Sequence, residues 1–365
     1  ASHGGGLSSA YINRIGTAVP PFDVHRKFLG FAPSLLRDDR DRRLFSRMAD
    51  RSGIEHRWSF VEPDPDPDGL DLNGFYRRGA FPDTAARMRF YERHAFGLAR
   101  AALDDLGLER ERGRITHLIT VSCTGFYAPG LDLQIVEHFG LAPQIERTMV
   151  GFMGCQAAIN ALKLARHIVR SEPDAAVLVL NLELCTLHLQ ETADLEQVLS
   201  FLIFGDGCAA TLVSAEPAGI AIDGFASVVM PESADQITWR IGPRGFDMVL
   251  SGQVPRTIGR GLPGDLAGML GGRAPQDIGL WAVHPGGRSV LDAVQEGLSL
   301  SDPQLAFSRQ VLRHYGNMSS ATVMFVLKEM LRSLQGAPER PAQGCAIAFG
   351  PGLTAETMLF RMLEG

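Results

Sequence analysis

The junction at residues 148–158 reads Thr148-Met149-Val150-Gly151-Phe152-Met153-Gly154-Cys155-Gln156-Ala157-Ala158. Its apolar first part is typical of a strand, its glycines of a tight turn, and its small residues of the start of a helix. Cys155 is therefore predicted at a helix N-terminus, where the helix dipole and free backbone N–H groups favour the thiolate and lower the thiol pKa. A free cysteine can equally be a small buried apolar residue, so Cys155 alone does not establish a nucleophile.

Outward from this junction, short β-rich runs alternate with longer amphipathic stretches. The predicted strands cover residues 115–122, 175–182, 209–213, 280–283 and 344–349. The predicted helices carry apolar residues three and four positions apart and cover 84–106, 156–169, 289–298, 303–315 and 321–334. This alternation indicates a layered α/β architecture. The strand-turn-helix order of the first half recurs around 281–298, which predicts an internal repeat.

Three further segments are interpreted as loops. The Pro/Asp-rich stretch 62–74 and the stretch 335–344, with two prolines and two glycines, are expected to be exposed. The run from Gly259 to Gly264 satisfies G-x-G-x-x-G, but it follows no clear strand and contains Pro263. We therefore expect a loop there and no dinucleotide site.

Composition bounds the class of protein. The chain has 365 residues, of which 45% are hydrophobic, so it can bury a large core in two lobes or one large domain. No apolar run approaches the roughly 18 residues of a membrane span, and the polar, Gly-rich start lacks a signal core, so cytoplasmic residence is expected. A net charge of −6 argues against a nucleic-acid binder. The five cysteines form no C-x-x-C pair, which predicts free thiols and no zinc knuckle.

Two other polar residues occupy junctions like that of Cys155. His284 follows an apolar strand in Trp281-Ala282-Val283-His284-Pro285-Gly286-Gly287-Arg288, and its neutral ring could donate to a carbonyl oxygen. Asn317 lies in His314-Tyr315-Gly316-Asn317-Met318-Ser319-Ser320-Ala321, just before a predicted helix. Each could also be an ordinary turn or capping residue. Junctions at one edge of a sheet can converge, and together the three would supply a nucleophile, a base that also donates, and an amide donor. That set suits acyl transfer coupled to formation of a thioester enolate.

Five motifs in order identify a family. The Cys155 junction, Phe204-Gly205-Asp206-Gly207-Cys208-Ala209-Ala210, His284-Pro285-Gly286-Gly287, Gly316 to Ala321 and Phe349-Gly350-Pro351-Gly352-Leu353-Thr354 resemble those of type III polyketide synthases, the chalcone and stilbene synthase superfamily. The resemblance runs from about Ile12 to Leu363 and is closest to bacterial-type members. It implies an α/β thiolase fold, a five-layered αβαβα arrangement of two pseudo-symmetric halves, which we place at 1–214 and 215–365. It also implies a homodimer.

The resemblance further implies roles for single residues. Cys155 resembles the nucleophile that takes the starter acyl group, while His284 and Asn317 would bind the thioester carbonyl of malonyl-CoA as it loses carbon dioxide. The implied gatekeepers are Phe204 and Met248, the latter where plant enzymes have Phe. Residues expected to shape the substrate cavity are Cys123, Thr186, Ser319 and Ala128, the last replacing a Met that reaches across the plant dimer.

The same resemblance assigns a place for coenzyme A. Arg47 and Arg51 match basic positions expected to contact its phosphates, whereas Leu44 stands where a Lys is usual. Arg43 or Arg288 could compensate for that change. Each of these arginines could equally be a solvated surface charge.

We therefore predict an acyltransferase that uses acyl-CoA and malonyl-CoA as substrates, without a cofactor or metal, and closes its product to a pyrone or phenolic ring. A fatty acyl starter is favoured; an aromatic starter or malonyl-CoA alone stays open, as do the number of extensions and the mode of cyclisation. The alternatives are a ketoacyl synthase III-like enzyme, which usually differs at the His284 tetrapeptide, and a thiolase, whose second cysteine Cys345 does not match. A non-enzymatic acyl-CoA-binding protein is disfavoured by the complete set of three residues.

Overall fold

The computed structural model describes residues 9–334 and 343–363. Most of the polar start and of the predicted loop 335–344 lies outside these residues. The strands are β1 Ala10–Ala18, β2 Phe22–Asp23, β3 Trp58–Ser59, β4 His117–Ser122, β5 Glu146–Gly151, β6 Ala176–Leu184, β7 Asp206–Ser214, β8 Ile220–Val229, β9 Ile237–Gly242, β10 Gly245–Leu250, β11 Leu280–Val283, β12 Gln343–Gly350 and β13 Thr354–Met362. The helices are α1 His25–Phe31, α2 Asp39–Asp50, α3 Thr84–Leu106, α4 Leu131–Phe139, α5 Ala157–Ser171, α6 Leu195–Ile203, α7 Val254–Met269, α8 Arg288–Leu298, α9 Asp302–Tyr315 and α10 Thr322–Leu334.

Every predicted strand and helix is present, with ends that differ by a few residues. The ends have local causes: α3 begins where the Asp83 side chain accepts a hydrogen bond from the Ala86 N–H, and it ends at Gly107, whose φ of 80° is left-handed. The stretch 62–74 is a loop, as predicted, closed by one isolated bridge between Pro63 and Asp71.

One mixed sheet runs through the molecule in the order β11-β12-β13-β8-β1-β7-β6-β4-β5. β4 pairs in parallel with β5 and β6, β11 pairs in parallel with β12, and the other pairs are antiparallel. Because β1 pairs with both β7 and β8, the sheet joins the two halves of the chain. The predicted boundary at 214/215 falls between β7 and β8, and its status as a domain boundary stays a prediction.

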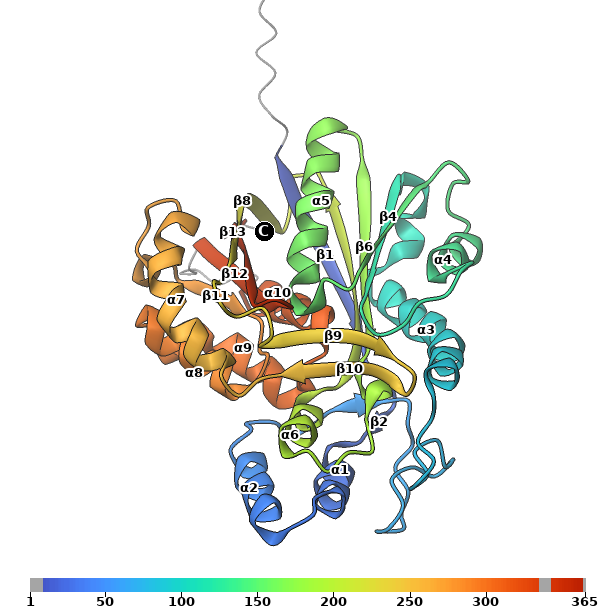
Figure 1. Cartoon of the computed structure of the whole chain (residues 1–365). Coiled ribbons are helices and arrows are strands. Elements are labelled where there is room, and N and C mark those ends of the chain that lie inside the picture. The colour runs from blue at the N-terminus through green and yellow to red at the C-terminus, as the bar shows by residue number, and fades with distance from the viewer. Residues whose placement is uncertain (1–8, 335–342, 364–365) are drawn as a thin grey trace, which may run out of the picture.

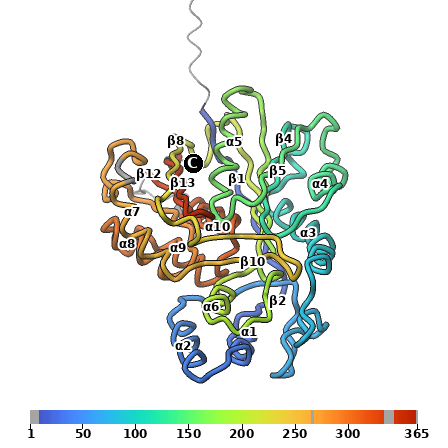
Figure 2. The backbone as a smooth tube through the Cα atoms, in the orientation of Figure 1, coloured from blue at the N-terminus to red at the C-terminus, as the bar shows by residue number. Residues whose placement is uncertain are grey.

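Alternation along the strands divides the core into layers, because successive side chains of a strand point to opposite faces. In β6, Val177 and Val179 join one core cluster and Leu178 and Leu180 another. The central cluster packs α5 and α10 between the two halves of the sheet (Figure 1, Figure 2). The outer faces pack against α3 and α4 on one side and against α7, α8 and α9 on the other. These five layers give the αβαβα order expected from the sequence.

The internal repeat is visible in the order of elements. β1, α3, β4, α4, α5, β6 and β7 of the first half are matched by β8, α7, β11, α8, α10, β12 and β13 of the second. In both halves the middle parallel pair, β4 with β6 and β11 with β12, leads to an antiparallel last strand. The central helices α5 and α10 correspond to each other and each follows a short 3-10 turn, Gly154–Gln156 and Ser319–Ala321.

The interpretation of Gly259 to Gly264 as a loop is wrong. These residues lie inside α7, with Pro263 within the helix. Ile258 and Leu262, four positions apart, are buried against α8 and the outer face of the sheet. Burial of this apolar stripe outweighs the low helix propensity of glycine and proline.

Within the described residues, no helix is long and apolar enough to cross a membrane. Cytoplasmic residence stays a prediction.

Candidate active site

Cys155 lies in the 3-10 turn Gly154–Gln156, between β5 and α5, as the junction predicts. Gly154 has a φ of 71°, and a Cβ on it would lie 2.3 Å from Cδ of Pro351, so this position requires glycine. The preceding Phe152 also has a positive φ, 57°. The turn therefore holds Cys155 against the loop that follows β12, in the second half of the chain.

His284 follows β11 directly, and its backbone N–H donates to the Ile347 carbonyl of β12 at 2.8 Å. Its side chain is buried, yet neither ring nitrogen has a hydrogen-bond partner among the described residues. An unpaired buried imidazole is costly, so it indicates a position meant for a ligand. Burial lowers the pKa of His284 to about 3, which leaves the ring neutral at pH 7.

Asn317 is fixed between the two halves by its backbone and its side chain. Its N–H donates to the Ile203 carbonyl at 2.7 Å, and its carbonyl accepts from the Gly205 N–H at 2.9 Å. Its Oδ1 accepts from the Ser319 N–H at 2.8 Å and from the Cys155 thiol at 3.8 Å, while Nδ2 donates to the Gly286 carbonyl at 3.4 Å. One side chain thus connects the loops that carry Cys155 and His284.

A single apolar cavity brings the three residues together. Its wall is lined by Cys123, Gly154, Cys155, Phe204, Ile237, Trp239, Met248, Leu250, Val254, His284, Gly286, Val290, Asn317, Ser319, Phe349, Gly350 and Pro351. A nucleophile, a neutral imidazole with unpaired ring nitrogens and an amide therefore line one space whose walls are mainly apolar.

Burial has opposite effects on the two titratable catalytic candidates. It raises the pKa of Cys155 to about 11, although hydrogen bonds with Ser319 and Asn317 act in the other direction. It lowers the pKa of His284, so the isolated groups are thiol and imidazole. Transfer of the thiol proton to the ring would make an ion pair in which each charge stabilises the other. The lowered thiol pKa expected from the helix N-terminus alone is therefore not what this environment produces.

Most of the other cavity residues expected from the sequence line this wall. Phe204, at the end of α6, and Met248, on β10, pack together with Cys185 in a small apolar cluster. Cys123 is buried, and its sulfur lies 3.2 Å from Oγ of Ser319.

Thr186 and Ala128 do not line the catalytic cavity. Thr186 instead hydrogen-bonds to Asp206 through its N–H and hydroxyl and lines a second cavity. Neighbouring side chains of this segment point in different directions. A shift of one residue in the sequence therefore changes which cavity a side chain lines. Ala128 is exposed on the loop before α4 and touches neither cavity in the single chain.

The second cavity shares one residue with the first, Phe204. It is lined by Val24, Lys27, Phe28, Arg57, Ser59, Val61, Leu70, Tyr76, Cys185, Thr186, Leu189, Phe201 and Phe204. The Phe204 ring thus belongs to the walls of both spaces, which places it where a gate between them would stand.

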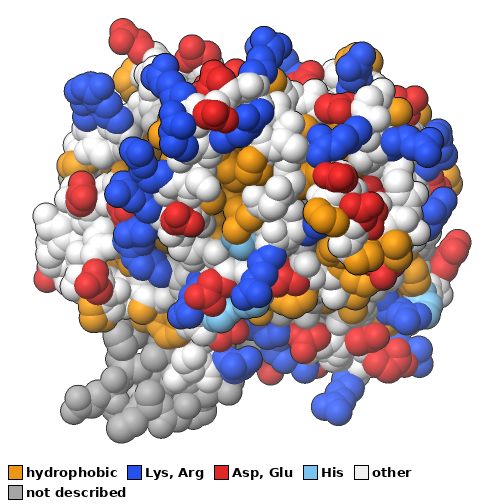
Figure 3. Space-filling view, turned by 90° about the horizontal axis from the view of Figure 1, so that it is seen from below, with side chains coloured by type: hydrophobic (Ala, Val, Ile, Leu, Met, Phe, Trp, Pro, Cys, Tyr) orange, Lys and Arg blue, Asp and Glu red, His pale blue; other side chains and the backbone are white. Residues whose placement is uncertain are grey.

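The arginines expected to contact coenzyme A are exposed at the end of α2. Arg47 lies in its last turn and Arg51 caps it, while Leu44 is only partly exposed. Arg288, at the start of α8, donates to the Arg51 carbonyl at 3.2 Å. This contact, which the sequence does not show, brings Arg288 to a position from which it could compensate for Leu44. Seen from below, Lys and Arg side chains on this face are interspersed with Asp and Glu side chains, with hydrophobic side chains between them (Figure 3).

Sequence reasoning missed Glu183, a buried carboxyl beside the cavity. It accepts hydrogen bonds from the Cys123 N–H and from the hydroxyls of Thr124 and Ser320, and burial raises its pKa. Its signal was present, because it is an acidic residue within an otherwise apolar strand. The wall formed by Ile237 and Trp239 of β9 carried no such signal.

Comparisons with known proteins agree with this geometry. Residues 84–217 match the chalcone and stilbene synthases, N-terminal domain, and residues 222–364 match the C-terminal domain of the same family. The alpha-pyrone synthesis polyketide synthase-like Pks18 of Mycobacterium tuberculosis is 34% identical, over 90% of this chain and 85% of that protein. Bisdemethoxycurcumin synthase of Oryza sativa subsp. japonica is 33% identical, over 96% of this chain and 92% of that protein.

Solved structures give the same result. The structure of 1,3,6,8-tetrahydroxynaphthalene synthase from Streptomyces coelicolor A3(2) is similar with a TM-score of 0.85 and 27% identity, over 97% of this chain and 100% of that one. The type III polyketide synthase domain of Steely1 from Dictyostelium has a TM-score of 0.87 at 22% identity, over 97% of this chain and 99% of that one. The chain belongs to the chalcone and stilbene synthase family and is a type III polyketide synthase with the thiolase fold, an enzyme of the acyltransferase type.

Proposed function

We propose that this enzyme loads a fatty acyl starter from coenzyme A onto Cys155, extends it with malonyl-CoA and closes the product to a pyrone or phenolic ring. The observation that carries the proposal is the shared cavity of Cys155, His284 and Asn317, with Phe204 between it and a second, largely apolar cavity. No cofactor or metal takes part in this proposed reaction.

The proposed loading step begins with proton transfer from the Cys155 thiol to His284. The thiolate attacks the starter thioester carbonyl, the carbon–sulfur bond to coenzyme A breaks, and the acyl group becomes a thioester of Cys155. The departing coenzyme A thiolate takes the proton from His284, which returns the ring to its neutral form. Asn317 holds the thiol through its Oδ1, which keeps sulfur pointed into the cavity.

In the proposed extension step, malonyl-CoA loses its carboxylate as carbon dioxide and the electron pair moves into a thioester enolate. The unpaired ring N–H of neutral His284 and the Asn317 amide supply donors for the enolate oxygen. The enolate carbon attacks the acyl group on Cys155, and the thiolate leaves. Neutral donors favour this step over a buried cation. A cation would also stabilise the malonyl carboxylate, and that carboxylate has to be lost in the reaction.

Two features support a fatty acyl starter from coenzyme A. The second cavity has mainly aliphatic and aromatic walls, which suits a hydrocarbon chain better than a charged group. The exposed pair of Arg51 and Arg288 suits the phosphates of coenzyme A, and a similar structure, CsyB at 21% identity, was solved as a complex with CoA-SH.

A homodimer through β5 is part of the proposal. Within the described residues β5 is an edge strand whose residues are mostly exposed, with Met149 50% and Met153 40% exposed nearby. An open edge strand of this kind offers its unpaired backbone N–H and C=O groups to the same strand of a second copy, which leaves the side chains on the two faces of the sheet. Light scattering should give twice the chain mass, and a monomer would contradict this part.

The test uses purified enzyme, malonyl-CoA and a panel of acyl-CoA starters that includes fatty, aromatic and no starter, with Cys155→Ala as the blank. Carbon dioxide release and product masses containing a fatty acyl group are expected. Products only from aromatic starters or malonyl-CoA alone would overturn the starter, and no polyketide from any mixture would overturn the proposed reaction. Mass spectrometry of trapped enzyme should place the acyl group on Cys155; an adduct on Cys123 or Cys208 would contradict the assignment.

A further inference from the structure

A histidine and two glutamates meet at the end of the sheet opposite the active-site cavity. His117 and Glu146 are the first residues of the parallel neighbours β4 and β5 and are direct partners in register. Glu172 follows the last residue of α5, where its N–H donates to the Ile168 carbonyl at 2.7 Å. Since Cys155 lies beyond the far end of β5, a six-residue strand of roughly 20 Å separates the cluster from it.

Thr116 determines which nitrogen of His117 faces the glutamates. Its hydroxyl donates to the Ala176 carbonyl at 3.2 Å and accepts from the Ala176 N–H at 3.0 Å. The same oxygen lies 2.8 Å from Nδ1 of His117. With Nδ1 held by Thr116, the other ring nitrogen, Nε2, is the one left to act as a ligand atom.

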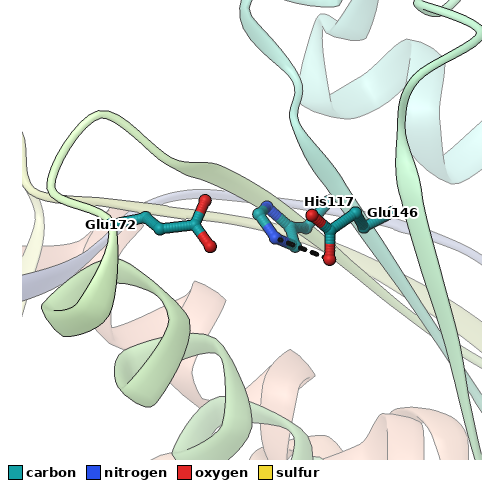
Figure 4. Close-up of side chains that lie close together, drawn as sticks. All are labelled: His117, Glu146 and Glu172. Carbon is teal, nitrogen blue, oxygen red and sulfur yellow. Dashed lines mark ion pairs between the residues drawn. The ribbon is translucent and has the colours of Figure 1, made fainter.

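The two carboxylates lie on opposite sides of the His117 ring (Figure 4). The His117 side chain is only 7% exposed, and its Nε2 lies 3.6 Å from Oε2 of Glu146, too long for a hydrogen bond. The Glu172 carboxylate approaches the ring from the other side. One ligand atom from each residue lies within 4.8 Å of the other two. An imidazole nitrogen and two carboxylates at this separation are a set of atoms that can bind one cation between them.

We propose that His117, Glu146 and Glu172 bind one divalent transition-metal ion, with zinc as the best match. An imidazole with carboxylates suits zinc better than calcium or magnesium, which take oxygen ligands. Tetrahedral ligands about 2.0–2.1 Å from zinc lie roughly 3.3 Å apart, so atoms that lie as much as 4.8 Å apart close by up to about 1.5 Å. Glu146 is 72% exposed and Glu172 is exposed, so both side chains are free to move and water can fill the fourth position.

The ion would act as a clamp and not as part of the proposed reaction. It would join β4, the edge strand β5, which leads to the Cys155 junction, and the turn from α5 to β6. A ligand that binds only the folded chain stabilises it in proportion to the logarithm of its concentration over Kd.

The test is calorimetric titration of the tag-free enzyme with Zn²⁺ at pH 7, after Cys155 has been alkylated so that its thiol does not compete. We expect one ion per chain, at least tenfold weaker binding in Glu146→Gln and Glu172→Gln, and no change in Glu137→Gln, an exposed control on α4 with the same loss of charge. Zn²⁺ should also raise Tm of the wild type and of the control, but not of the two site variants. No binding to the wild type, or equal binding to all four proteins, would overturn the proposal.

Discussion

At the scale of single residues, Cys155 rests as the thiol, which the loading step cannot use directly, while His284 rests as the neutral ring that can take its proton. Burial raises the pKa of the thiol and lowers the pKa of the ring. Reactivity therefore depends on their forming an ion pair, and His284 should contribute more to the thiolate than the N-terminus of α5 does.

Replacing His284 by Ala should shift the pH profile of Cys155 alkylation upward. Without the ring, the thiolate must form against a pKa of about 11, so the rate with iodoacetamide should still be rising about tenfold per pH unit at pH 9. The wild type should level off at a lower pH. An exposed control, His138→Ala, should match the wild type, and superimposable profiles for wild type and His284→Ala would contradict the ion pair.

Phe204 is the second residue whose role can be isolated. In Phe204→Ala the two cavities that share this ring would merge, so long straight-chain acyl-CoA starters should gain relative to short ones. We expect the ratio of kcat/KM for long over short starters to rise by about tenfold, the size of a few methylene contacts. Phe96→Ala on α3, remote from both cavities, is the control. An unchanged ratio in an enzyme that still extends short starters would show that Phe204 is no gate.

At the scale of elements, the conformation of the loop between β5 and α5 depends on a glycine. Gly154 packs against Pro351, which follows β12, so this contact sets the distance between the two halves of the site. The Cys155 turn and the turn before α10 correspond in the repeat, and Asn317 joins them through the thiol.

Gly154→Ala should lower activity more than its effect on stability alone would predict. The added Cβ would lie 2.3 Å from Cδ of Pro351, which is an overlap. The alanine would also have to adopt a left-handed φ of 71°, at a cost of about 1–3 kcal/mol. Relief of that overlap moves Cys155, so kcat should fall at least tenfold in protein that is still folded. The control Gly97→Ala, in α3 with open space around it, should equal or exceed the wild type in stability. Equal kcat in the two variants would refute this account.

At the scale of the whole molecule, buried titratable groups set the response to acid. His188 and His284 have their pKa lowered by burial to about 3, and His25 to about 4. The unfolded chain takes up these three protons near pH 6.5, whereas the folded protein does not. Burial raises the pKa of Asp206 to about 7, so the folded protein holds a proton on this carboxyl and partly offsets the imidazoles. Burial also raises the pKa of Glu183, which acts in the same direction.

Three imidazoles less the Asp206 carboxyl leave an excess of two protons on the unfolded chain, which predicts that stability falls as pH falls from about 6.5 to 5. The free energy of unfolding should drop by at most about 2.7 kcal/mol per pH unit, a slope that the raised pKa of Glu183 reduces, measured by urea unfolding with tryptophan fluorescence. His25→Gln removes one of the three imidazoles and should flatten this slope. Equal stability of the wild type at pH 7 and pH 5 would contradict the prediction.

The sequence by itself determined the local elements, the layered α/β class and the three junctions at which Cys155, His284 and Asn317 stand. These follow from periodicity and from glycine placement, which act over a few residues. The ordered motifs added the family, which the comparisons confirm.

Only the tertiary structure decided which side chains share a space. Thr186 turned to another cavity, Glu183 came beside Cys123, and the glycine pattern within 259–264 became helix because its apolar stripe is buried. The meeting of His117 with Glu172 depends on strand register and on where α5 ends. Each of these results rests on contacts between residues distant in the chain, and local sequence patterns carry no record of such contacts.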